Sequence, residues 1–122
     1  MSDFEYTYRD LGNFETAFSD YIVNPELTNP EIFLVGQGIE RYLNEWLASY
    51  LDSRADAKKE EAVVYVPEDL HKYILSFVGR LINELESRIQ QTDQDSYWYD
   101  EYREWLGNMR YVHEKLEEKI PI

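Results

Sequence analysis

The sequence contains no cysteine, and only two histidines, four prolines and five glycines occur among its 122 residues. The absence of cysteine excludes disulfide bonds, zinc sites built on thiolates and catalytic thiols. A chain of this length buries roughly two-thirds of its unfolded surface without such crosslinks, so we expect residues 1–122 to form a single acidic helical domain. A cysteine-free chain suits a reducing compartment, and we expect a cytoplasmic location.

Long apolar runs are also absent, and the run at residues 32–35 spans only four positions. A helix that crosses a bilayer needs about 20 predominantly apolar residues. A secretion signal needs a basic segment followed by an apolar stretch, and the first residues of the sequence show neither feature. We therefore expect a soluble protein that does not enter a membrane.

Basic residues are scarce, because 12 Lys and Arg stand against 25 Asp and Glu, which gives a net charge of −13. The excess is largest at the two ends: −7 over residues 1–40 (eight acids, one base), −2 over 41–92 (nine and seven) and −4 over 93–122 (eight and four). Such a surface repels the phosphates of nucleic acids and anionic lipids, so we expect no direct binding of either. The charge favours a basic protein partner, although it would also serve solubility alone.

The hydrophobic pattern predicts an all-α fold, an antiparallel bundle of three long helices plus one shorter N-terminal helix. The shorter helix is expected to begin near Asn13 and to end before Asn24-Pro25. The long helices are expected to start at Asn29-Pro30, at Pro67 and at Asp95 or Ser96, where capping residues or prolines precede apolar stripes.

The stripes predict which side chains enter the core. Apolar residues recur at three- and four-residue steps along each long helix, which is typical of one buried face. By this spacing Tyr42, Tyr73 and Ile120 belong to the stripes of the three long helices. We therefore expect these three residues to contribute to the core.

Two short segments depart from the helical pattern. Aromatic residues at positions 4, 6 and 8 alternate with polar ones, and residues 62–66 are rich in β-branched side chains. Both patterns are typical of short strands, and residues 4–8 could pair with residues 62–66 as a minor two-stranded element. The alternative for residues 62–66 is an extended segment that packs on the bundle.

Candidate metal ligands are few. Glu68 and His71 form one Glu-x-x-His pair, whereas Arg110 stands three residues before His113, so the second pair of a di-iron bundle is missing. The simpler interpretation of His71 is a surface histidine near acidic residues. We expect no bound metal and no cofactor.

Motifs for catalysis are incomplete. Gly36-Gln37-Gly38 lacks both the third glycine of a dinucleotide site and the Gly-Lys-Ser/Thr ending of a P-loop. The segment 93–95 lacks the glycine that an EF-hand requires, and no serine stands in a nucleophile elbow. Adjacent carboxylates point about 100° apart on a helix and are usually solvated, so they do not indicate acid–base catalysis. We expect no enzyme activity, and a small enzyme or ligand-binding bundle is the third alternative.

The aromatic content is the most unusual feature, with 11 tyrosines and 3 tryptophans. The rings of residues 97–99 spread over about 200° of a helix, so some of them are expected at the surface beside acids that would select a basic partner. The alternative is that they cover a second helix. The predicted partner-binding residues are Tyr97, Tyr99, Asp100, Glu101, Glu104, Asp93 and Asp95, together with Glu15 and Asp20 from the acidic first third.

This combination of features is shared by inhibitors that imitate DNA and by immunity proteins that block basic nucleases. Carboxylates spaced along helices can occupy sites built for phosphates. The leading hypothesis is therefore an acidic protein-binding modulator or inhibitor that occupies a basic surface of a partner that handles nucleic acid. The alternative is a homodimeric structural or assembly protein without catalytic activity, whose exposed aromatics are buried against a second copy.

Overall fold

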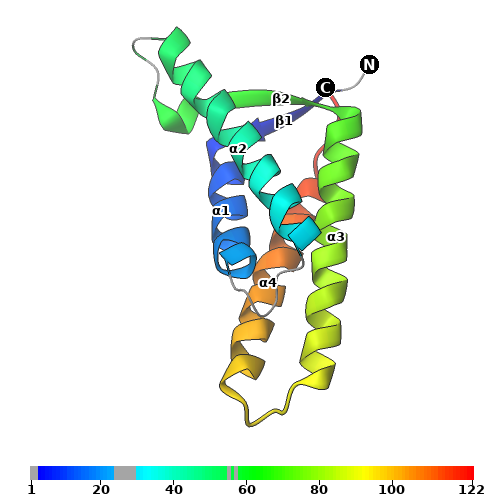
Figure 1. Ribbon diagram of the computed structural model, residues 1–122. Coiled ribbons are helices and arrows are strands. Elements are labelled where there is room, and N and C mark those ends of the chain that lie inside the picture. Colours follow the sequence, from blue (N-terminus) through cyan, green and yellow to red (C-terminus); the bar gives the residue numbers. More distant parts are fainter. Residues whose placement is uncertain (1–2, 24–29, 55, 57) are drawn as a thin grey trace.

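The computed structural model of the protein describes residues 3–23, 30–54, 56 and 58–122, without the side chains of residues 19–23 and 33. The elements are β1 (Asp3–Thr7), α1 (Tyr8–Val23), α2 (Pro30–Ser53), the short 3₁₀ turn η1 (Lys59–Glu61), β2 (Val63–Pro67), α3 (Glu68–Gln91) and α4 (Tyr97–Glu117) (Figure 1). The predicted helical fold with a minor two-stranded element is confirmed.

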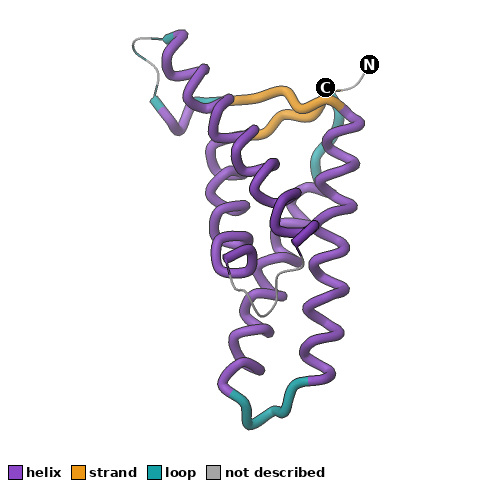
Figure 2. Tube along the Cα trace, in the orientation of Figure 1, coloured by secondary structure: helices purple, strands orange, loops and turns teal. Residues whose placement is uncertain are grey.

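The helices α3 and α4 form an antiparallel hairpin, α1 packs against α4, and α2 packs against α1. The two strands lie side by side across one end of this assembly (Figure 2). The opposite ends of α3 and α4, joined by residues 92–96, extend beyond α1 and α2 (Figure 1). The hairpin therefore has one end covered by other elements and one free end.

The two strands are antiparallel, and Phe4 pairs with Val66 while Tyr6 pairs with Val64. These four side chains are buried, because alternate residues of both strands face the helices. The predicted pairing is confirmed, with each strand shifted by one residue from the predicted bounds. The backbone N–H of Ile122 donates a hydrogen bond of 2.8 Å to the carbonyl oxygen of Asp3, which holds the C-terminal segment beside β1.

The helix α1 begins five residues before the predicted start at Asn13, so that prediction is wrong. The backbone N–H of Thr7 donates to Asp10 Oδ2 at 2.7 Å, and the N–H of Asp10 donates to Thr7 Oγ1 at 3.4 Å. This reciprocal pair is a capping box, which fixes the first turn at Tyr8. The segment Asn24-Pro25 and the predicted cap Asn29 lie outside the described residues.

The other predicted helix starts are confirmed. The helix α3 begins directly after Pro67, with Glu68 and Asp69 in its first turn. In α4, the side chain of Ser96 caps the helix, because its Oγ accepts a hydrogen bond of 3.3 Å from the N–H of Trp98. Acidic groups near these N-termini interact favourably with the helix dipole.

The core contains apolar side chains from both strands and all four helices. Three stripe predictions are wrong: Tyr42 is 44 % exposed, Tyr73 is 52 % exposed and Ile120 is 81 % exposed. Tyr42 directly precedes the fully buried Leu43. Adjacent residues on a helix point about 100° apart, so Tyr42 lies at the edge of the α2 face that packs on α1. Ile120 lies beyond the end of α4 at Glu117 and therefore no longer follows the helical spacing.

Among the described residues, no helix combines the length and the apolar character that crossing a membrane requires.

Candidate functional site

The predicted partner-binding residues of the last third lie at the free end of the α3–α4 hairpin. Asp93 and Asp95 are exposed in the connection between the helices, and Asp100 and Glu104 are exposed one turn apart on α4. Tyr97 is 71 % exposed among these carboxylates. We refer to these five residues as the acidic tip. It combines negative charge with one accessible aromatic ring.

The remaining aromatics of this segment face inward. Trp98 stacks on Tyr102 with ring centroids 5.9 Å apart, and Tyr102 lies 5.7 Å from Trp105. Tyr102 and Trp105 belong to the core, and Trp98 packs against it from the outside. The two interpretations of the aromatic segment thus apply to different residues, with Tyr97 at the surface and the tryptophans in the bundle.

Two further predicted residues of this segment are only partly accessible. Tyr99 is half-buried, and the guanidinium carbon of Arg103 lies 5.7 Å from the centre of its ring. Glu101 is also half-buried. Because Arg103 already covers one face of Tyr99, this tyrosine offers less contact area than Tyr97 does.

A second feature is a groove between α1 and α2, which the sequence analysis did not predict. The groove has a volume of about 1040 Å³. Its lining includes the apolar side chains of Leu11, Phe14, Leu43 and Leu47 and five charged residues, Arg9, Glu15, Glu40, Lys59 and Glu60. Of the two acids predicted in the first third, Glu15 lines this groove, whereas the side chain of Asp20 lies outside the described part of the chain.

Glu40 is the residue of the groove that sequence reasoning missed. Its Oε1 atom is buried and has no hydrogen-bond partner among the described residues. Burial raises the pKa of this carboxyl group, and the nearby charge of Glu15 raises the pKa further. The signal in the sequence was its position, because Glu40 stands three and seven residues before Leu43 and Leu47 and so interrupts an apolar helix face.

Gly12 leaves part of the groove open. It lies on α1, and a Cβ atom added to it would meet no other atom within 4 Å. A larger side chain at this position would therefore project into the groove without displacing the backbone. This makes Gly12 a place at which the groove can be filled by substitution.

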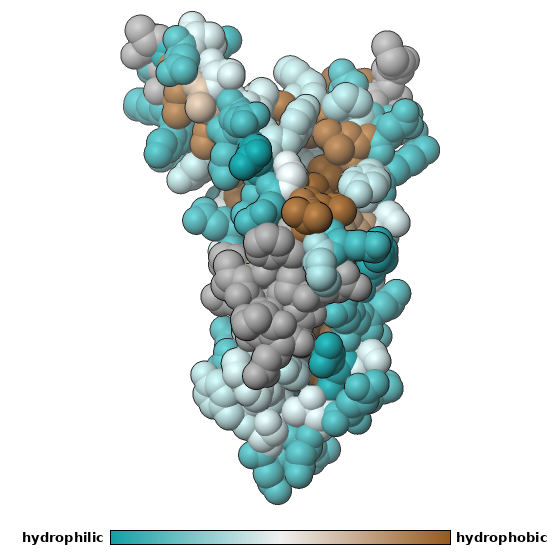
Figure 3. Space-filling model, viewed as in Figure 1, coloured by the Kyte–Doolittle hydropathy of each residue, from teal (hydrophilic) through white to brown (hydrophobic). Residues whose placement is uncertain are grey.

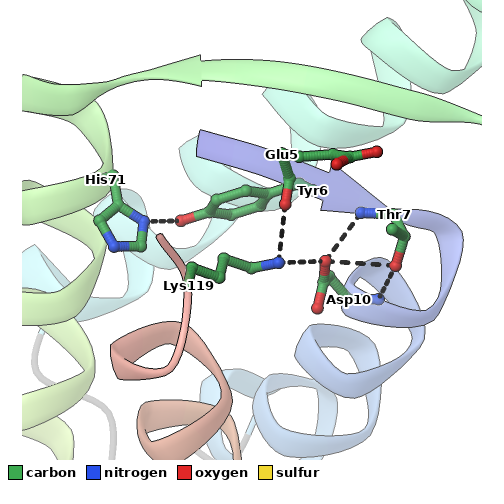
Figure 4. Close-up of polar contacts among 6 residues, drawn as sticks. All are labelled: Glu5, Tyr6, Thr7, Asp10, His71 and Lys119. Atoms are coloured by element: carbon green, nitrogen blue, oxygen red, sulfur yellow. Dashed lines mark hydrogen bonds and ion pairs between the residues drawn. The ribbon is translucent and has the colours of Figure 1, made fainter. Parts of the chain in front are cut away.

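A third polar feature lies beneath the sheet (Figure 4). The hydroxyl of Tyr6 lies 2.8 Å from Nδ1 of His71. The ammonium group of Lys119 donates to the carbonyl oxygen of Glu5 at 2.7 Å and to Asp10 Oδ2 at 2.8 Å. We refer to Tyr6, Asp10, His71 and Lys119 as the sheet clamp.

The interpretation of His71 as a surface histidine is wrong, because its side chain is 3 % exposed and stacks on Phe4 at 3.7 Å between ring centres. Burial lowers the pKa of His71, and the charge of Lys119 lowers it further. Burial likewise raises the pKa of Tyr6, so a protonated phenol lies beside the imidazole, and the tautomer of His71 determines which of the two groups donates the hydrogen bond. The cluster joins β1, α1, α3 and the C-terminal segment, so we interpret it as a structural device that holds the sheet on the bundle.

Within the described ranges, no group of three or more His, Asp or Glu side chains is arranged to hold a metal ion. Nδ1 of His113, the other histidine, lies 2.7 Å from Glu117 Oε1 one turn later on α4.

Comparison of the chain with protein families, with curated proteins and with solved structures finds no match. The acidic tip and the groove are therefore the two surface features that indicate a function.

Proposed function

We propose that the protein is an acidic binding protein that occupies a basic surface on a partner protein that handles nucleic acid, in the manner of a DNA mimic or an immunity-type inhibitor. On this proposal it acts by binding, without catalysis and without a cofactor. The single observation that supports it most is the acidic tip, where four exposed carboxylates stand before and after an exposed tyrosine along the chain of a projecting helical hairpin.

The spacing of the tip carboxylates suits a site for phosphates. Asp100 and Glu104 lie four residues apart on α4, which places them about 6 Å apart along the helix axis. This spacing is comparable to the separation of neighbouring phosphates along one strand of DNA, so a surface with two phosphate sites could accept both carboxylates. A net charge of −13 would also attract such a basic surface from a distance.

Tyr97 would supply contact energy that charge alone does not. Exposed tyrosine gives a large, rigid contact area with a polar end, and such residues are common in the centres of interfaces. Charge pairs at an interface mainly determine the rate and the specificity of association. The proposed complex should therefore weaken as salt rises but persist in part.

The proposal is tested with the tagged protein and lysate of its native host, at low and at moderately high salt, with mass spectrometry of the retained proteins. The triple variant Asp100→Lys, Glu101→Lys, Glu104→Lys reverses charge at two residues of the tip and at the neighbouring, half-buried Glu101. The matched control Glu45→Lys, Asp52→Lys, Glu114→Lys makes the same change in net charge at exposed positions elsewhere.

We expect the wild type and the control to retain one basic protein that handles nucleic acid, less of it at higher salt. The tip variant should lose that protein while its circular dichroism spectrum stays unchanged. Equal retention by the tip variant and the control would contradict the role of the tip.

Self-association is the second candidate, and a specific observation favours it. On α2, Leu34 is 67 % exposed and Tyr42 is 44 % exposed. Apolar side chains also gather on the surface over α2 and its border with α3, just below the sheet (Figure 3). In the same experiment, retention of only a second copy of this chain, indifferent to salt, would favour a homodimer over the acidic inhibitor.

A further inference from the structure

The groove between α1 and α2 contains a hydrogen-bond acceptor without a partner. Oε1 of Glu40 is shielded from solvent and receives no hydrogen bond from the described residues. Buried polar groups in proteins are almost always hydrogen-bonded, and a buried carboxylate is especially unfavourable without a donor. Arg9 and Lys59 line the same groove, yet the ion pairs of the described residues do not include either of them with Glu40. Because Oε1 itself is closed to solvent, a molecule in the groove would stabilise the Glu40 carboxylate by its charge, from the part of the side chain that lines the groove.

The charge around Glu40 indicates a cationic donor. The carboxylate of Glu15 is close enough to make ionisation of Glu40 more difficult. Two neighbouring carboxylates repel each other unless a positive group lies beside both. A metal ion is the less suitable occupant, because no third His, Asp or Glu is placed to complete its ligand set among the described residues.

The size and lining of the groove select an organic cation. Its volume of about 1040 Å³ is at the upper end of the range for ligand pockets, so it exceeds what a small ion needs. The apolar lining includes the buried Phe14 and Leu43. Apolar walls below a carboxylate suit a side chain with an aliphatic stem and a charged end.

Arginine fits these requirements better than lysine does. Its guanidinium is planar, carries five N–H donors and is less strongly hydrated than an ammonium group. One guanidinium can therefore bond two carboxylates at once while its stem lies on apolar side chains.

We propose that the groove binds an arginine-containing segment of the basic partner, with the guanidinium between Glu40 and Glu15 and the aliphatic stem against Phe14 and Leu43. This inference rests on the proposed function, because it names the part of the partner that enters the groove. It adds a second binding surface to the acidic tip.

The probe is a capped, fluorescent pentapeptide with a central arginine flanked by leucines, and binding is measured by fluorescence anisotropy. The control peptide replaces arginine with citrulline, which has nearly the same shape and no charge. We expect the arginine peptide to bind at least about tenfold more tightly, since the charged hydrogen bonds are lost with citrulline. Equal binding of the two peptides would overturn the inference.

Two variants, each with a matched control, test whether the peptide binds in the groove. Glu40→Gln removes the charge and should weaken binding at least about tenfold, whereas Glu45→Gln on the exposed face of α2 should leave it unchanged. Gly12→Leu projects a side chain into the groove and should abolish binding, whereas Gly12→Ala adds only one carbon and should retain it. Both substitutions at Gly12 favour the helix, so the fold should persist, which circular dichroism checks. Full binding by Glu40→Gln or by Gly12→Leu would overturn the inference.

The peptide experiment needs no partner, so this inference and the proposed function can fail separately. If lysate retention depends on the acidic tip but the arginine and citrulline peptides bind alike, the groove inference fails and the proposed function stands. If the arginine peptide binds as expected and no basic protein is retained from lysate, the groove is a cation site and the proposed function fails.

Discussion

Glu40→Gln should stabilise the isolated protein at neutral pH while it removes the proposed site for arginine. In the folded protein, Oε1 of this carboxylate is buried and has no partner in the part of the chain that the structure describes. Ionisation of Glu40 is therefore more costly in the folded chain than in the unfolded chain, where water solvates the charge. Glutamine keeps the size of the side chain and removes this cost.

The magnitude follows from the burial of one oxygen. An unsatisfied buried polar group costs about 1–3 kcal/mol. The Glu40 side chain is only partly buried, and an amide leaves one of its own atoms unpaired there, so we expect a gain near the lower limit, about 1 kcal/mol. For a chain of this size the midpoint of thermal unfolding should rise by roughly 3–6 °C.

The pH dependence of this gain has a definite sign. The pKa of Glu40 is raised above its ordinary value of 4.5 in the folded protein, so the folded chain takes up the proton more readily than the unfolded chain. The penalty is complete above the folded pKa and disappears below pH 4.5, where the residue is neutral in both states. The advantage of Glu40→Gln should therefore vanish on acidification.

Urea denaturation followed by circular dichroism at pH 7.5 and pH 4 measures this difference, with Glu45→Gln as the control. The control should change the free energy of unfolding by less than about 0.5 kcal/mol, as is usual for exposed positions. A Glu40→Gln variant that is no more stable than the wild type at pH 7.5, or equally stabilised at both pH values, would refute the reasoning about the orphaned oxygen.

The sheet clamp gives two further predictions. Because burial lowers the pKa of His71 below 6.5, the unfolded chain binds a proton more readily, and the free energy of unfolding should fall as pH drops through 6.5. His71→Gln keeps an acceptor for Tyr6 and should flatten this dependence in denaturation curves between pH 7.5 and 5.5, whereas His113→Gln should not. Lys119→Met removes two hydrogen bonds from a largely buried ammonium group and should cost about 2 kcal/mol in urea denaturation. If Lys119→Met lowers the free energy of unfolding by no more than Lys115→Met, which removes a more exposed ion pair, the clamp does not hold the sheet on the bundle.

Local chemistry made much of the fold predictable. Pro67 followed by two acids, and Ser96 before an apolar stripe, marked helix starts that the structure confirms. The start of α1 was missed because the Thr7–Asp10 capping box lies inside the alternating pattern that predicted the strand. The strand and the cap share Thr7, and hydrophobic periodicity alone does not separate two elements that meet at one residue.

The site was less predictable, because it depends on which helices meet. The helical spread of the rings at residues 97–99 predicted that some of them reach the surface, and Tyr97 does. The burial of Glu40 depends instead on α1 packing across α2. A single glutamate beside apolar residues signals such a site only after its facing helix is known. His71 was misjudged for the same reason, since strand β1 covers it from a distant part of the sequence.

The order of folding follows from how the sheet is closed. The helices α3 and α4 are joined by residues 92–96 alone, whereas pairing of Thr7 with Val63 closes the whole segment 8–62. Loop entropy makes the second closure more costly by about 2 kcal/mol, so the α3–α4 hairpin should form early and β1 should dock late. In unfolding, β1 and the C-terminal segment should open first, which hydrogen exchange would detect. The acidic tip would then remain structured on the α3–α4 hairpin after β1 has separated from it.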